Sequence, residues 1–193
     1  EWFGVTESGV EPDIITMAKG LGGGFMPIGA VIAHGRVHDA LQQAGASFVH
    51  GESFTGHVLM STAGTAVIEY IRDHDLLQHA QKMSQVLREV MDPLAELPHV
   101  GDVRGRGFIR GLELVADKET KQPFPRSLKF AERIAKATAQ EGVLVLAGTA
   151  GVDGMNGDTI VIAPPLVTTE AEVRLIGEVL QRALIGVAQE MQS

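Results

Sequence analysis

The chain has 193 residues, of which 45% are hydrophobic and 21% are charged, and its formal net charge is −8. A chain of this length and composition can bury a substantial core, so we expect a globular protein with a cytoplasmic location. The acidic balance without a basic cluster argues against a nucleic-acid partner, the lack of an apolar run of roughly 20 residues argues against a membrane span, and the lack of cysteine excludes disulfides and thiolate metal sites.

A short buried strand is predicted over residues 14–18, because the apolar run Ile-Ile-Thr-Met-Ala is bounded by Pro12 and Gly20. Lys19 follows directly, where the strand gives way to glycines. Partial desolvation of a lysine in such a place favours the neutral amine that attacks carbonyl groups. A lysine before a glycine is more often a solvated loop residue, so the surrounding sequence decides between the two interpretations.

The next elements are a second strand over 28–33 and a helix over 36–44 that ends at Gly45. A loop over 48–56 precedes a further helix over 57–71. This helix is rich in small residues, so we expect it to pack closely against other elements.

An amphipathic helix is predicted over residues 76–94, where apolar residues recur with a period of 3.6. The composition becomes more charged near Asp73 to Leu76, and we place a domain boundary there. The two predicted domains are residues 1–75 and residues 76–193.

The second domain alternates strands and helices, which is an α+β pattern. Strands are predicted at 102–104, 108–115, 143–146 and 159–163, and helices at 128–140 and after Thr169. In the strand over 108–115, Arg110 falls on the same face as Phe108, Leu112 and Leu114. Thr169 and Glu172 form a capping box at the start of the last helix.

Three rival kinds of site have incomplete motifs. His34 and His38 lie four residues apart near a helix start, but no third ligand supports a metal site, so both are interpreted as surface residues. The segment 51–55 resembles a serine-hydrolase nucleophile elbow but ends in threonine, and the segment 20–25 lacks the last glycine of a dinucleotide-binding motif.

The stretch over residues 10–31 reads Val-Glu-Pro-Asp-Ile-Ile-Thr-Met-Ala-Lys-Gly-Leu-Gly-Gly-Gly-Phe-Met-Pro-Ile-Gly-Ala-Val. It closely resembles the signature of the class III aminotransferases, which bind pyridoxal phosphate on the α/β type I fold. In that family the lysine that matches Lys19 holds the cofactor as a Schiff base and moves the proton during amino transfer. The resemblance implies that residues 1–75 are the end of the large cofactor domain and that residues 76–193 are the small C-terminal α+β domain.

The resemblance covers all 193 residues but only the later half of the enzyme. The chain also begins at Glu1 rather than at a methionine, in a Trp-Phe-Gly stretch typical of a domain interior. We therefore expect the chain to be a segment of a longer protein, and we expect this segment to be inactive by itself.

The segment over residues 50–57, His-Gly-Glu-Ser-Phe-Thr-Gly-His, is similar to a second family motif. Ser53 stands where the family has a threonine whose hydroxyl binds the cofactor phosphate of the neighbouring subunit, which implies a homodimer with shared active sites. Thr55 is a second candidate for this contact, and Val58 replaces a proline. From the residues alone, Ser53 or Thr55 could equally cap the following helix.

Many members of the family bind the substrate carboxylate with an arginine of the small domain, but here no arginine occurs between Arg133 and Arg174. The amino donor, the acceptor and the carboxylate contact therefore stay open. The glycine-rich segment over 147–158 in this region either borders the active-site entrance or is a flexible surface connection.

The resemblance thus implies transfer of an amino group from an amine or amino acid to a 2-oxo acid, with pyridoxal phosphate on Lys19. One alternative is an aminomutase of the glutamate-semialdehyde type, which moves the amino group within one molecule. Another is a non-catalytic homologue that acts as a dimerisation or binding module.

Overall fold

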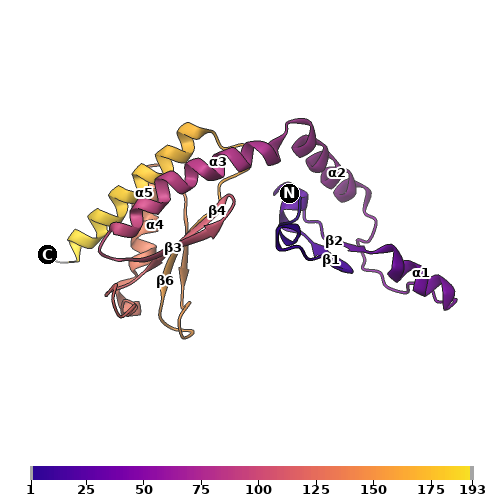
Figure 1. The fold of residues 1–193 in the computed structure, drawn as a ribbon, viewed down its shortest axis with the longest axis horizontal. Coiled ribbons are helices and arrows are strands. Elements are labelled where there is room, and N and C mark those ends of the chain that lie inside the picture. Colours follow the sequence, from indigo (N-terminus) through magenta and orange to yellow (C-terminus); the bar gives the residue numbers. More distant parts are fainter. Residues whose placement is uncertain (1, 192–193) are drawn as a thin grey trace. The chain divides into compact units, whose positions relative to one another are not determined.

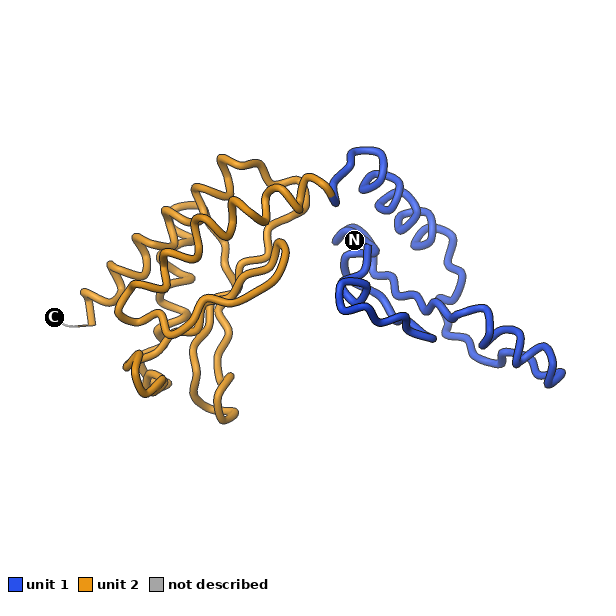
Figure 2. The backbone as a smooth tube through the Cα atoms, viewed as in Figure 1, with its two compact units in different colours: residues 1–77 blue, residues 78–193 orange. Residues whose placement is uncertain are grey.

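The computed structural model describes residues 2–191 of the chain (Figure 1). It divides into two compact units, residues 1–77 and residues 78–193, which Figure 2 distinguishes by colour. That these units are the end of a large cofactor domain and a small C-terminal domain stays a prediction. None of the helices formed by residues 2–191 combines the length and apolarity that crossing a bilayer requires.

The first unit contains two short antiparallel strands, β1 (Ile14–Met17) and β2 (Ala30–Ala33), which pair with Ile14 opposite Ala33. The strands predicted over 14–18 and 28–33 are therefore confirmed, but the expected burial of the first is wrong. Ile14 is 55% exposed, because a sheet of only two strands has few neighbours to cover its faces.

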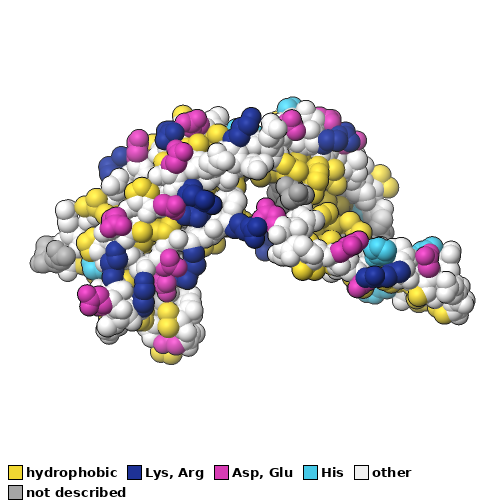
Figure 3. Space-filling model, in the orientation of Figure 1, with side chains coloured by type: hydrophobic (Ala, Val, Ile, Leu, Met, Phe, Trp, Pro, Cys, Tyr) yellow, Lys and Arg dark blue, Asp and Glu magenta, His cyan; other side chains and the backbone are white. Residues whose placement is uncertain are grey.

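Helices α1 (Gly35–Gln43) and α2 (Val58–Asp73) complete the first unit, after the short 3-10 helices η1 (Gly4–Ser8) and η2 (Lys19–Gly22). Both helices were predicted from the sequence. The expected close packing of α2 is confined to one place: its only buried residue within the described chain is Gly64, and apolar side chains of α2 lie at the surface (Figure 3).

The second unit is a four-stranded antiparallel sheet with the order β3-β4-β6-β5. Its strands are β3 (Val100–Arg106), β4 (Ile109–Leu114), β5 (Leu146–Thr149) and β6 (Asp158–Ile162). Its helices are α3 (Leu76–Met91), which starts at the boundary between the units, α4 (Phe130–Gln140) and α5 (Glu170–Glu190). The 3-10 helices η3 (Asp92–Glu96) and η4 (Arg126–Leu128) lie between these elements.

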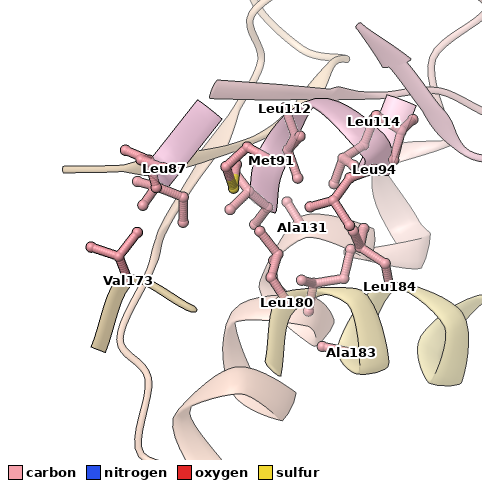
Figure 4. Packing of buried hydrophobic residues seen from close by; sticks show 14 of the residues in the cluster. Leu87, Met91, Leu94, Leu112, Leu114, Ala131, Val173, Leu180, Ala183 and Leu184 are labelled. Atoms are coloured by element: carbon pink, nitrogen blue, oxygen red, sulfur yellow. The ribbon is translucent and has the colours of Figure 1, made fainter. Parts of the chain in front are cut away.

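The three helices of this unit pack on one face of the sheet. Figure 4 shows Leu87 and Met91 of α3 and Leu180 of α5 facing Leu112 and Leu114 of β4. All five side chains are at most 1% exposed. Burying each such side chain contributes about 1.5–3 kcal/mol, so this interface is the main stabilising element of the unit.

Arg110 lies on the buried face of β4, as the alternation in the sequence predicts, and is only 7% exposed. Its guanidinium forms an ion pair with Asp92 of η3 and donates a hydrogen bond to the carbonyl oxygen of Gly105 at 3.3 Å. A buried guanidinium requires such partners because an unpaired buried charge is strongly destabilising.

The strand predicted over 143–146 is displaced in the structure, where β5 begins at Leu146. The Val143 amide donates to the carbonyl oxygen of Thr138, so residues 143–145 still belong to the exit from α4. Pairing with β6 starts only where Leu146 lies opposite Val161. Gly148 lies in this strand opposite Thr159, where a Cβ atom would lie 2.3 Å from the Thr159 hydroxyl oxygen, so the position has no room for a larger residue.

The capping box of the last helix is confirmed. The Glu172 carboxylate accepts the Thr169 amide at 2.7 Å, and the Thr169 hydroxyl accepts the Glu172 amide at 3.4 Å. These two hydrogen bonds satisfy backbone amides that the helix itself leaves unpaired. Donation from the Thr169 amide and the Thr169 hydroxyl to the Glu172 carboxylate holds the pKa of Glu172 below its usual value.

Two glycines of α5 allow a test of this packing. A Cβ atom at Gly177 would lie 2.6 Å from Val90 Cβ on α3, whereas one at Gly186 would meet nothing within 4 Å. Gly177→Ala should lower the free energy of unfolding by about 1–3 kcal/mol through overpacking. Gly186→Ala should raise it by up to about 1 kcal/mol through helix propensity. Urea denaturation of the protein that carries this chain measures both, and equal effects would contradict the packing described.

Candidate functional site

Lys19 lies at the end of β1, where the chain turns into η2. Ala18 is extended, with φ −157°, and Lys19 then adopts the left-handed conformation, with φ 50°. A side chain other than glycine is disfavoured in this region by roughly 1–2 kcal/mol, so the turn holds Lys19 at an energetic cost. The residue lines a shallow open hollow together with Ala18 and residues 24–29.

The sequence predicts partial desolvation of Lys19, but the residue is exposed in this chain. Within residues 2–77, no carboxylate lies against its amine. The amine is therefore accessible to a ligand on the surface of the first unit.

The glycine turn after Lys19 packs against α2. Leu21 and Gly22 are the more buried residues of η2, and Leu21 lies next to Gly64 of the helix. The same helix begins directly after the loop that carries Ser53 and Thr55, so one rigid element connects both predicted site segments.

Ser53 and Thr55 lie in the turn before α2, and their hydroxyl groups differ in their contacts. The Thr55 hydroxyl accepts the Glu52 amide at 2.8 Å, and the Thr55 amide donates to the Glu52 carbonyl oxygen at 2.9 Å. Within the described residues the Ser53 hydroxyl forms no hydrogen bond. Thr55 thus holds the turn together, while Ser53 is available to a ligand.

Neither hydroxyl caps α2, although capping was the alternative interpretation. The N-cap residue is His57, and no side chain hydrogen bonds to the first amides of the helix. Unpaired amides at a helix N-terminus attract anions. The start of α2 therefore offers amide donors in addition to the Ser53 hydroxyl.

The two histidines considered for a metal have local contacts instead. His34 Nδ1 accepts the Arg36 amide at 3.2 Å and caps α1, and His38 lies 3.5 Å from the Asp39 carboxylate. Between residues 2 and 191, no group of three or more His, Asp or Glu side chains is arranged to hold a metal ion.

The glycine-rich segment over 147–158 is mostly ordered by its own contacts. Its first residues belong to β5, and the Asp153 carboxylate accepts the amides of Met155 at 2.8 Å and Asn156 at 2.6 Å. Asn156 Nδ2 donates to the same carboxylate at 2.8 Å. Whether this hairpin tip borders an active-site entrance stays a prediction.

A buried charged cluster in the second unit was not identified from the sequence. Asp158 is 2% exposed, and burial, reinforced by the neighbouring Glu132, raises its pKa. Burial is the largest single influence on Glu132 and works to raise its pKa, but the hydrogen bond from Arg126, a backbone hydrogen bond and the charges of Arg126 and Lys129 together lower that pKa. Nothing in the sequence signals this cluster, because its members come from η4, α4 and β6.

The family model described as Aminotransferase class-III matches residues 1–184 of the chain. An adenosylmethionine-8-amino-7-oxononanoate aminotransferase of Methanocaldococcus jannaschii is 34% identical over 177 residues, which are 90% of this chain and 37% of that protein.

Solved structures of aminotransferases are also similar to this chain. An (S)-enantioselective omega-transaminase from Thermomicrobium roseum matches with a TM-score of 0.86 and 31% identity, over 97% of this chain and 40% of that one. The PMP-bound form of an aminotransferase from Vibrio fluvialis matches with a TM-score of 0.85 and 30% identity, again over 97% and 40%. The chain thus spans 37% to 40% of the length of these relatives.

The Asp153 contacts predict an unusual titration. Hydrogen bonds from the Asn156 and Met155 groups lower the pKa of Asp153 from 3.8 to about 2. The stabilisation of the turn is therefore complete above the ordinary value and is lost as pH falls toward 2. Carbon-13 NMR titration of the Asp153 carboxyl should show this midpoint.

Asn156→Ala removes one donor to this carboxylate and should move the Asp153 midpoint upward, toward the ordinary aspartate value. The Asp117 carboxyl, whose pKa is lowered by Thr120 instead, serves as the internal control and should not change. An Asp153 midpoint that is the same in both proteins would show that the Asn156 side chain does not lower this pKa.

Proposed function

The chain belongs to the class III aminotransferases, which depend on pyridoxal phosphate, and from this premise we propose that the complete protein transfers an amino group from an amine or amino acid to a 2-oxo acid. The predicted type I fold of these transferases is confirmed by the structural matches. The chain spans well under half of the length of its relatives. The activity and the partners of the whole protein are therefore proposed here.

The observation that carries the proposal is the position of Lys19 at the end of β1, in the hollow beside the glycine turn. We assign Lys19 as the residue that holds the cofactor covalently as a Schiff base. The cofactor, when bound, withdraws electrons from the substrate carbon. With the cofactor released to the substrate amine, the Lys19 amine would carry the proton from that carbon to the position that receives it during amino transfer.

The residues around the Ser53 turn fit a phosphate group. The Ser53 hydroxyl is a free donor, and the uncapped amides at the start of α2 lie a few residues farther along the chain. A phosphate accepts hydrogen bonds from both kinds of donor. We assign Ser53 as the phosphate contact, given across a homodimer, with Thr55 as a weaker candidate because its hydroxyl already holds the turn.

The first unit exposes apolar side chains near these segments. Phe25 is 82% exposed, Phe48 is 77% exposed and Val49 is 92% exposed. Such exposure is typical of surfaces that contact other protein. We propose that the rest of the complete protein and its second copy cover them, so that this segment by itself is inactive.

Reduction with borohydride tests the assignment of Lys19. In the complete protein loaded with pyridoxal phosphate, peptide mapping should find the label on Lys19. Lys19→Ala should remove the label and lower transamination with an added 2-oxo acid by at least about 10²-fold, because both the attachment point and the proton carrier are lost. Lys82→Ala, an exposed lysine of α3, is the matched control and should change neither.

A label on another lysine would contradict the assignment. Product formation without any added 2-oxo acid would instead indicate the intramolecular reaction of an aminomutase.

Ser53→Ala should weaken cofactor binding, because a hydrogen bond to a charged group contributes about 1.5–3 kcal/mol, or roughly 10- to 150-fold in Kd. Ser53→Thr restores the hydroxyl and should restore the affinity. Thr55→Val should have the smaller effect on Kd, since that hydroxyl accepts the Glu52 amide. Titration of the cofactor-free protein with pyridoxal phosphate measures each Kd, and the reverse order would exchange the two roles.

A further inference from the structure

Gly64 is the buried residue at which α2 meets the turn after Lys19. A Cβ atom at Gly64 would lie 3.0 Å from Ile28 Cδ1 and 3.7 Å from the carbonyl oxygen of Leu21. Contacts of 3.0 Å are shorter than carbon atoms normally adopt. A Cβ atom at Gly64 would therefore press on the Ile28 side chain, while it would reach the Leu21 carbonyl oxygen at an ordinary contact distance.

Two glycines of the turn itself, Gly22 and Gly23, also lie where a Cβ atom would be too close to a neighbouring side chain. A Cβ atom at Gly22 would lie 3.1 Å from Ile28 Cγ2, and one at Gly23 would lie 2.9 Å from Val67 Cγ2 on α2. The Ile28 side chain thus fits between Gly22 and Gly64. The three glycines make one contact, which we call the glycine contact.

The glycine contact is linked to Lys19 by the hydrogen bonds of η2. The Leu21 amide donates to the Ala18 carbonyl oxygen at 3.1 Å, and the Gly23 amide donates to the Gly20 carbonyl oxygen at 3.1 Å. Lys19 lies between these groups, in a left-handed conformation that the turn imposes. A displacement of Leu21, or of Gly22 through its contact with Ile28, therefore acts on the turn that holds Lys19.

We infer that Gly64 is a positioning residue for Lys19: the missing side chain sets the distance between α2 and the turn, and with it the place of the Lys19 amine. This inference rests on the proposed function of Lys19. A glycine in the middle of a helix is less favourable than alanine by up to about 1 kcal/mol, so helix stability alone does not favour it at this position.

The test uses the complete protein and three variants, Gly64→Ala, Ile28→Val, and the two combined. Gly64→Ala adds the Cβ that meets Ile28 Cδ1, and Ile28→Val removes that Cδ1 atom, so the double variant relieves the contact that the single one creates. Gly186→Ala, a mid-helix glycine of α5 with open space around it, is the matched control.

Two readouts are needed. The first is the rate of acetylation of Lys19 relative to Lys136 in the cofactor-free protein, as a function of pH. The second is the transamination rate of the loaded protein, since small misplacements at a reacting group reduce rates strongly. We expect Gly64→Ala to shift the Lys19 labelling profile and to lower kcat about 10-fold, with an unfolding midpoint that is equal or higher.

The double variant should restore both readouts toward the wild type, and Gly186→Ala should change neither. An unchanged Lys19 labelling profile in Gly64→Ala would overturn the inference whatever happens to the activity. A changed profile that Ile28→Val does not restore would overturn it as well. Failure of the proposed function is separate: it appears as a wild-type protein whose borohydride label is not on Lys19, and the labelling readout does not use the cofactor.

Discussion

The close approach between α2 and the turn after β1 is the constraint on which the first unit depends. Its two strands bury little and its helices are largely exposed, so few other contacts fix the position of Lys19. Glycines at the contact remove the side chains that would separate the backbones. The result is a lysine held by a short, well-defined turn on an otherwise open surface, which suits a residue that must react with a bound molecule.

The second unit is stabilised in a different way. Its three helices cover one face of an antiparallel sheet, and the core between them is closed and apolar. Of the charged groups that enter it, Arg110 pairs with Asp92, whereas Asp158 lies near Glu132 and has a raised pKa because of burial and this like charge. The first unit instead leaves phenylalanine and valine side chains exposed.

Much of this architecture could be predicted from the sequence, because the signals are local. The apolar period of α3, the alternation in β4 and the capping box of α5 each depend on residues within a few positions of one another. The predicted position of β5 was wrong because the start of this strand is set by pairing with β6, and not by its own apolar residues. The burial of β1 was overestimated because burial depends on neighbouring elements.

The site was accessible to sequence reasoning only in part. Lys19 and Ser53 were chosen by resemblance, and their roles stay predictions. The difference between Ser53 and Thr55 required the contacts of the Thr55 hydroxyl with the Glu52 amide. Gly64 was a visible interruption in a helical pattern, but its contact with Ile28 joins segments 36 positions apart and has no sequence signal.

Gly148 and Thr159 illustrate how such a contact restricts change in the hairpin of β5 and β6. They lie directly opposite each other, and the threonine hydroxyl occupies the space that any larger residue at position 148 would need. Position 148 can therefore be enlarged only when position 159 becomes smaller, whereas Thr159 can be reduced alone. A mutational library that varies the two positions together would reach substitutions at 148 that are strained when the threonine is kept.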